Sequence, residues 1–223
     1  MAEHAARLHL IWDFDGTLYD SYPLMAAQLT QALAEFGIVE QPQAVYALIK
    51  RTMYHGICTL AQRHALDRQA LAAAVQRQQR KPSVFPSMEG LAACLADTAA
   101  LGCRHYLFTH RDRSALKQLA ADGLAHWFID AVTRETGFAD KPSPQAILAL
   151  MDRHHFTPSQ TVMIGDRDLD ILSGAAAGAR GILLDPQGFY PTLAATWRVQ
   201  RLAQIPDLLR TLPQGDPAAP LQV

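Results

Sequence analysis

Two aspartates stand one residue apart near the start of the chain, in the segment Asp13-Phe14-Asp15-Gly16-Thr17. The apolar run from Leu8 to Trp12 precedes them and is typical of a buried strand in a parallel sheet. Side chains alternate in an extended chain, so Asp13 and Asp15 can point the same way. Carboxylates at the end of a buried strand repel each other and lose hydration, and a divalent cation offsets both costs. The pattern indicates metal-assisted chemistry, although Asp and Gly are also ordinary turn residues.

Length and composition limit the classes of protein to which the chain can belong. With 223 residues, of which 49% are hydrophobic, it can bury a sizeable core in one or two domains. The formal net charge of -1 gives no electrostatic reason to expect nucleic acid or a membrane surface as a partner. No apolar run is long enough to span a bilayer, and the start of the chain has no apolar signal core. The 3 cysteines form no CxxC pair, and we expect free thiols in a cytoplasmic protein.

Helical periodicity dominates the stretch that follows the first strand. Its composition is rich in Ala, Leu, Gln and Arg, and it shows no strand-like alternation. The expected helices are Asp20–Phe36, Ala44–Met53, Gly56–Ala65 and Arg68–Arg80. A Pro-rich segment then interrupts the helical pattern. We therefore expect a small separate helical lobe over residues 18–82, inserted into a core made of residues 1–17 and 83–212, with a disordered tail over 213–223.

The remainder of the chain alternates between helices and short apolar strands. The expected helices are Glu89–Ala100, Ser114–Asp122, Gln145–His154 and Ile171–Ala177, and the expected strands are Arg104–Thr109, Trp127–Thr133, Thr161–Ile164 and Gly181–Leu184. This alternation predicts an α/β fold with a doubly wound parallel sheet. The carboxyl ends of such strands lie along one edge. We therefore expect Asp13 and Asp15, Thr109, and Asp166 with Asp170 to meet in one crevice, with Lys141 reaching it from a loop.

Four segments in this order resemble the motifs of the haloacid dehalogenase superfamily. The segments are Asp13-Phe14-Asp15-Gly16-Thr17, then Thr109, then Lys141-Pro142, then Gly165-Asp166-Arg167-Asp168-Leu169-Asp170. The first and the last are specific, whereas an isolated Thr or Lys-Pro carries little weight. Nearly the whole chain is covered, and the resemblance is to phosphatases with a helical cap after the first motif, of the phosphoglycolate phosphatase and β-phosphoglucomutase type.

The resemblance implies a role for each acidic residue. Asp13 would be the nucleophile that forms an acyl phosphate, and Asp15 would be the general acid and base. Mg²⁺ would be held by the Asp13 carboxylate, the Asp15 backbone carbonyl and Asp166. Asp170 would support the site by positioning Lys141 or a metal-bound water. Helix capping is the alternative role for Asp166 or Asp170.

The same resemblance assigns the phosphate-binding groups. Thr109 would donate its hydroxyl to a phosphoryl oxygen, and Lys141 would offset the charge of Asp13 and the phosphate. The alternatives are an ordinary strand end for Thr109 and a solvated side chain for Lys141. His110 and Arg111 depart from the small or amide residue that often follows Thr109 in this family. We expect His110 to be a phosphate-binding residue with Thr109 and Lys141, and contact with the cap or a purely structural role are the alternatives.

These residues predict a Mg²⁺-dependent phosphatase of a small phosphorylated metabolite. Asp15 argues against the dehalogenase and phosphonate-cleaving branches, in which that position is not an acid. A sugar-phosphate mutase with the same nucleophile remains an alternative, and a non-catalytic binding module is a third. Neither the substrate nor the oligomeric state can be read from the residues.

Overall fold

The computed structural model describes residues 8–80 and 84–212, and the expected tail over 213–223 lies outside them. The described residues form two compact units. The first unit comprises the described residues within Met1–Leu18 and Ser87–Val223, and the second comprises those within Tyr19–Pro86. In the described part of the chain, no helix is both long and apolar enough to cross a membrane.

The first unit is built on a six-stranded sheet in the order β3-β2-β1-β4-β5-β6, and every pair of neighbours is parallel. The strands are β1 (His9–Trp12), β2 (Arg104–Phe108), β3 (Phe128–Val132), β4 (Thr161–Gly165), β5 (Arg180–Leu184) and β6 (Trp197–Val199). Each residue of β1 is buried, because this strand lies between β2 and β4. The predicted doubly wound parallel sheet is confirmed.

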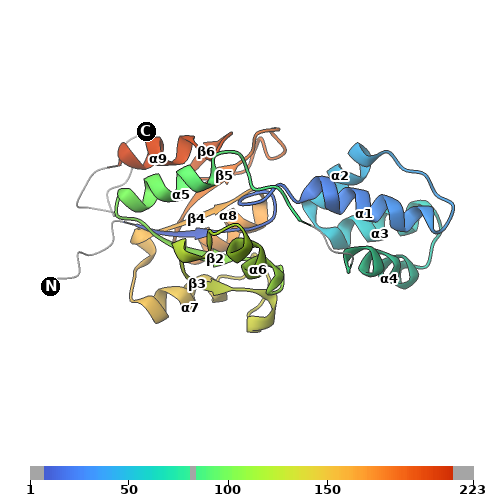
Figure 1. Cartoon of the computed structure of the whole chain (residues 1–223), viewed down its shortest axis with the longest axis horizontal. Helices are drawn as coiled ribbons and strands as arrows, with labels where there is room; N and C mark the ends of the chain where they lie inside the picture. Colours follow the sequence, from blue (N-terminus) through green and yellow to red (C-terminus); the bar gives the residue numbers. More distant parts are fainter. Residues whose placement is uncertain (1–7, 81–83, 213–223) are drawn as a thin grey trace. The chain divides into compact units, whose positions relative to one another are not determined.

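Helices cover both faces of this sheet, with α5 and α9 on one side and α6 and α7 on the other (Figure 1). The helices are α5 (Leu91–Ala100), α6 (Ser114–Ala121), α7 (Gln145–His154), α8 (Asp168–Ala176) and α9 (Gln204–Arg210). The face under α7 has a core in which Ile147 and Leu150 of the helix pack with Ile11 and Met163 of the sheet. Most boundaries lie within two residues of those predicted, and α7 has the predicted bounds.

Two elements near the C-terminal end were not predicted. Strand β6 is three residues long and has an exposed Arg198 at its centre, so it shows little apolar alternation. Helix α9 has seven residues and contains Pro206, which weakens a helical pattern. Both elements depend on tertiary packing rather than on a strong local pattern.

The second unit contains α1 (Tyr22–Ala34), α2 (Pro42–Arg51), α3 (Met53–Arg63) and α4 (Arg68–Gln79). Pro42 starts α2 because proline suits the first turn of a helix, where its missing N–H costs nothing. The Thr52 hydroxyl accepts a hydrogen bond from the His55 N–H and caps α3, and Asp67 caps α4 in the same way at the Ala70 N–H. This unit has an apolar core of its own, built on residues such as Leu29, Leu60 and Leu71.

Candidate active site

The parallel register places the ends of the central strands side by side. Trp12 of β1 pairs with Leu107 of β2 and with Ile164 of β4. The N–H of Asp13, the next residue, donates to the Ile164 carbonyl at 2.9 Å, so the chain leaves β1 against the end of β4. Residues that follow these strands therefore meet at one edge of the sheet, as expected for a doubly wound fold.

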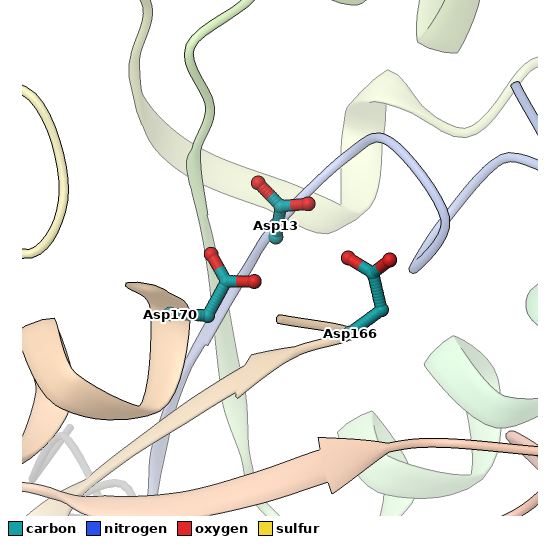
Figure 2. A group of neighbouring side chains, drawn as sticks. All are labelled: Asp13, Asp166 and Asp170. Carbon is teal, nitrogen blue, oxygen red and sulfur yellow. The ribbon is translucent and has the colours of Figure 1, made fainter. Parts of the chain in front are cut away.

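Three carboxylates gather at this edge (Figure 2). Asp13 follows β1, Asp166 follows β4, and Asp170 lies in the first turn of α8. One carboxylate oxygen from each residue lies within 4.8 Å of the other two, and all three side chains are buried. Three buried acidic groups at this spacing repel one another unless positive charge is placed among them.

Lys141 supplies one positive charge within the cluster. Its buried ammonium donates to Asp13 Oδ1 at 2.6 Å, to Asp170 Oδ1 at 2.7 Å and to the Phe108 carbonyl at 2.8 Å. Burial alone would lower the pKa of Lys141, but Asp13 and Asp170 outweigh it and raise that pKa above its ordinary value. The lysine is therefore charged and bridges two acids that lie far apart in the sequence.

The two bridged acids have different electrostatic environments. Burial, with the nearby charge of Asp170, raises the pKa of Asp13 to about 7. Burial acts in the same direction on Asp170, but the charges of Lys141 and Arg167 outweigh it and hold the pKa of Asp170 below its usual value. The hydrogen bonds add to the contrast, because Asp170 Oδ2 accepts the Arg167 N–H at 3.1 Å, whereas Asp13 Oδ2 is buried and has no hydrogen-bond partner among the described residues.

The unsatisfied oxygen of Asp13 is the observation that tests whether the residues fit a metal ion. A buried carboxylate oxygen without a hydrogen bond is costly, and coordination to a cation removes that cost. Asp166 offers a second carboxylate, whose Oδ1 accepts the Thr17 hydroxyl at 3.4 Å. These oxygen donors fit a hard divalent cation.

Asp170 lies near the other acids and also holds Lys141 and the start of α8 in place. Both of its carboxylate oxygens accept hydrogen bonds, one from Lys141 and one from the N–H of Arg167 at the start of α8. The helix begins at Asp168, three residues before the predicted start, because acidic residues in a first turn favour the helix N-terminus. Gly165 permits the close approach, since a Cβ there would lie 2.3 Å from Asp170 Cβ.

Thr109 and His110 follow β2 at the same edge of the sheet. The Thr109 side chain is buried, and its Oγ1 accepts the N–H of Arg111 at 3.0 Å, so its own hydrogen can be donated elsewhere. The His110 Nε2 accepts the backbone N–H of Lys141 at 2.8 Å. Burial, with the charges of Lys141 and Arg167, lowers the pKa of His110 to about 4, which keeps this nitrogen an acceptor. The ring therefore supports the loop that carries Lys141.

Asp15, the second acid of the first motif, lies outside the three-carboxylate cluster and has a partner of its own. The Arg111 guanidinium contacts both of its carboxylate oxygens, Nη2 at Oδ1 and Nε at Oδ2, the latter at 3.3 Å. The residues alone gave Arg111 no role. Its departure from the family pattern after Thr109 was the one signal that marked it.

The loop that follows β5 carries Tyr190, whose hydroxyl is influenced by the charges of Asp168 and Asp166. The buried Asp185 accepts the N–H groups of Phe189 and Tyr190 at 2.8 and 3.1 Å and an Arg198 hydrogen bond at 2.6 Å, which shapes this loop. Burial, followed by the charges of Asp168 and Asp166, raises the pKa of Tyr190. No sequence motif marks it, because its position depends on the loop.

The chain is similar to known proteins over most of its length. Residues 10–184 match the haloacid dehalogenase-like hydrolase family. The chain is 28% identical over 194 residues to a phosphoglycolate phosphatase from Rhodospirillum rubrum, and the match covers 78% of each chain. It is 27% identical over 187 residues to a phosphoglycolate phosphatase from Haemophilus influenzae, with 75% of this chain and 80% of the relative covered.

Solved structures give the same fold. A hydrolase from Streptococcus pneumoniae TIGR4 is similar at a TM-score of 0.63 and 26% identity, over 93% of this chain and 100% of that chain. A predicted phosphoglycolate phosphatase from Haemophilus somnus is similar at a TM-score of 0.78 and 17% identity, with the same coverage of both chains. At 17% identity, the second likeness supports the fold alone.

Proposed function

Since the chain belongs to the haloacid dehalogenase-like hydrolase family, we propose that it is a Mg²⁺-dependent phosphatase of a small phosphorylated metabolite, with Asp13 as its nucleophile. The predicted resemblance to this family is confirmed by the match over residues 10–184.

The arrangement of Asp13 carries the proposal. One carboxylate oxygen is held by the Lys141 ammonium at 2.6 Å, and the other is buried without a hydrogen-bond partner among the described residues. The lysine fixes the carboxylate in one orientation and leaves an oxygen available. A carboxylate held in this way is suited to attack a phosphorus atom.

The reaction follows from the positions of two acids. An Asp13 oxygen attacks phosphorus, the bond from phosphorus to the leaving oxygen breaks, and Asp15 gives its proton to that oxygen. Asp15 then takes a proton from a water molecule as the water attacks the phosphorus of the aspartyl phosphate. The bond between Asp13 and phosphorus breaks, inorganic phosphate leaves, and both acids return to their starting states.

The remaining residues lower the cost of the charge that develops. Lys141 lies against the nucleophile, and Asp170 fixes the lysine through the 2.7 Å contact with its Oδ1. Thr109 can donate its hydroxyl to a phosphoryl oxygen, because its Oγ1 already accepts the Arg111 N–H. We propose that His110 supports this set through the Lys141 backbone and does not bind phosphate.

Asp13 and Asp166 of the acidic group would hold the Mg²⁺, together with the backbone carbonyl of Asp15, which the family resemblance implies. When bound, the ion offsets the negative charge of the carboxylates and the phosphoryl group. Asp170 is part of the same acidic group, but both of its oxygens accept protein hydrogen bonds. We therefore assign it to the positioning of Lys141.

The names of the curated relatives suggest a first substrate to test. Those reported above are phosphoglycolate phosphatases, so 2-phosphoglycolate is the metabolite with which to begin. We propose that the unit Tyr19–Pro86 acts as the cap and selects among substrates. The likenesses to solved structures below 25% identity carry no argument about substrate.

Phosphate release from p-nitrophenyl phosphate and 2-phosphoglycolate tests the proposal, with Mg²⁺ and after its removal by a chelator. We expect activity that depends on Mg²⁺ and that is abolished in Asp13→Asn. Asp97→Asn, at an exposed position of α5, is the matched control and should retain activity. Full activity in Asp13→Asn would contradict the nucleophile assignment.

The same preparations separate the alternatives. Isomerisation of a hexose phosphate that outruns phosphate release would indicate a mutase. An aspartyl phosphate trapped on Asp13 would exclude a non-catalytic binding module. Absence of both turnover and a trapped intermediate, over a panel of phosphorylated metabolites, would overturn the proposed function.

A further inference from the structure

We propose that Arg111 is a positioning residue that holds Asp15 in the orientation needed for proton transfer. This inference rests on the proposed function, because it concerns the acid and base of that reaction. It arises from the two-point contact between the Arg111 guanidinium and the Asp15 carboxylate, which joins residues 96 positions apart. A guanidinium that contacts both oxygens fixes the plane of the carboxylate as well as its position.

Arg111 is itself anchored at three points. Its backbone N–H donates to Thr109 Oγ1 at 3.0 Å, and its backbone carbonyl accepts the Arg134 N–H at 3.0 Å. Its guanidinium carbon lies 5.4 Å from the centre of the buried Phe14 ring, within the range of a cation–π contact. The segments that follow β2 and β3 thus fix the backbone of Arg111, and Phe14, in the segment that follows β1, contacts its guanidinium.

Burial makes this contact more than a surface ion pair. The side chains of Arg111 and Asp15 are 18% and 19% exposed, whereas the neighbouring pair Arg113–Glu135 is 77% and 50% exposed. Exposed pairs fix little, because water competes for both partners and long side chains keep their freedom. The Arg111–Asp15 pair is shielded enough from water to hold one geometry.

The arrangement also separates the two acids of the first motif. Lys141 contacts Asp13 at 2.6 Å, and Arg111 contacts Asp15. Each carboxylate therefore contacts a cation of its own. Asp13 is held for attack on phosphorus, and Asp15 is held to serve the leaving oxygen and later the water.

Two aryl phosphates of similar shape provide the test. The phenyl phosphate leaving group needs a proton as its bond to phosphorus breaks, whereas p-nitrophenolate leaves without one. We expect Arg111→Gln to lower kcat/KM for phenyl phosphate about tenfold more than for p-nitrophenyl phosphate, as part of the roughly 10²- to 10⁴-fold effect of a general acid. The value of kcat/KM reports the steps up to release of the phenol. The ratio of kcat/KM for p-nitrophenyl phosphate to kcat/KM for phenyl phosphate therefore isolates the proton donation.

The second half of the reaction supplies an independent readout. In Arg111→Gln, aryl release from p-nitrophenyl phosphate should be followed by slow hydrolysis of the aspartyl phosphate, because the base is misplaced. A burst of p-nitrophenol equal to the enzyme concentration is the expected signature. Arg111→Lys keeps the positive charge but loses the planar contact with both Asp15 oxygens. It should give a ratio of kcat/KM values between those of the wild type and Arg111→Gln.

Matched variants separate this effect from general damage. Arg113→Gln removes an exposed arginine two residues away and should leave the ratio unchanged. Asp15→Asn should raise the ratio by itself, and Arg111→Gln added to it should raise the ratio no further, because the two residues act as one unit. Thermal denaturation checks that each variant is folded.

A proportional loss with both substrates in folded Arg111→Gln, or an additive effect in the double variant, would overturn the inference and leave the proposed function intact. A rise in KM with an unchanged ratio would make Arg111 a substrate-binding group and would also overturn it. A wild-type protein that releases phosphate from neither aryl phosphate nor from any metabolite of the panel described above would remove the proposed function itself, and the inference with it.

Discussion

The ammonium of Lys141 lies 2.6 Å from Asp13 Oδ1 and 2.7 Å from Asp170 Oδ1, and all three side chains are buried. Two buried carboxylates without this cation would leave uncompensated charge in a poorly polarisable environment. The lysine therefore contributes to the stability of the unit as well as to the proposed chemistry. These two contributions can be measured apart.

Lys141→Met should abolish phosphatase activity and lower the free energy of unfolding of the sheet-containing unit by about 3 to 5 kcal/mol, the cost of leaving buried charge unpaired. Urea denaturation followed by tryptophan fluorescence measures this, because Trp12, Trp127 and Trp197 all belong to that unit. Lys117→Met, at an exposed position of α6, is the control and should change little. The double variant with Asp170→Asn should recover part of the stability but no activity, and a single variant as stable as the wild type would contradict the expectation.

Gly165 provides a steric test of the same cluster. A Cβ at this position would lie 2.3 Å from both Cβ and Cγ of Asp170, so the acid would have to move. Gly165→Ala should destabilise the unit by about 1 to 3 kcal/mol, as overpacking usually does, and should also displace Lys141 and reduce activity strongly. Activity assays and urea denaturation measure both effects.

Gly181→Ala in the neighbouring strand is the matched control for Gly165→Ala. The nearest atom to its added Cβ would be the flexible end of Ile171, at 3.1 Å, so this variant should retain most activity. Equal losses of activity in the two variants would show that the contact with Asp170 is not the cause.

At the scale of elements, β1, β2 and α5 are joined by a buried polar contact. The Trp12 indole N–H donates to His105 Nδ1 at 3.0 Å, and His105 Nε2 lies 3.4 Å from the Thr98 hydroxyl oxygen in α5. Because Nδ1 accepts, the ring must be neutral with its hydrogen on Nε2. Burial lowers the pKa of His105 to about 4.

This pKa shift predicts how the stability depends on pH. The unfolded chain binds a proton at His105 more readily than the folded chain, so this contribution is complete above about pH 6.5 and is lost as the pH falls towards 4. Between pH 7 and pH 5 the loss attributable to His105 is about 2 kcal/mol. His105→Gln should therefore show a loss of stability that is smaller by this amount.

Urea denaturation at the two pH values, followed by tryptophan fluorescence, measures the difference. His126→Gln, at an exposed position after α6, serves as the control and should behave like the wild type. An equal pH dependence in His105→Gln and the wild type would show that His105 does not cause the loss.

At the scale of the whole molecule, the chain has two cores and two connections. The helical unit packs Leu29, Leu60 and Leu71 together, and the sheet-containing unit packs Ile11 and Met163 with α7. The connections run side by side, because the Asp20 N–H donates to the Pro86 carbonyl and the Met88 N–H donates to the Leu18 carbonyl, each at 2.9 Å. Separate cores and adjacent connections are features of a unit that can be removed without breaking its neighbour.

Replacing residues 20–85 by a short Gly-Ser linker should therefore leave the sheet-containing unit folded. The linker has little distance to close, so its entropic cost is small. We expect cooperative urea unfolding by tryptophan fluorescence and a circular dichroism spectrum with less helix. A chain that shows solvent-exposed tryptophans and no cooperative transition would contradict the independence of the two cores.

Local patterns were sufficient to predict much of the fold. Helix α7 was predicted with its observed bounds, and the strands that end at Trp12, Phe108 and Gly165 were placed within one residue. The repeat of apolar side chains along a strand or helix is a property of neighbours in the chain, so it can be read from the residues. Strand β6 and helix α9 were missed because each is short and its apolar positions are few.

The candidate site, like the fold, was predicted from local patterns only in part. The sequence by itself determined which acids, which lysine and which threonine follow strand ends, since these belong to short motifs. The contacts of Lys141 with Asp13 and Asp170, the acceptor role of His110 and the pairing of Arg111 with Asp15 were decided by the tertiary structure. These contacts join residues that are 29 to 128 positions apart, so they depend on strand register and on loop paths, which no local pattern records.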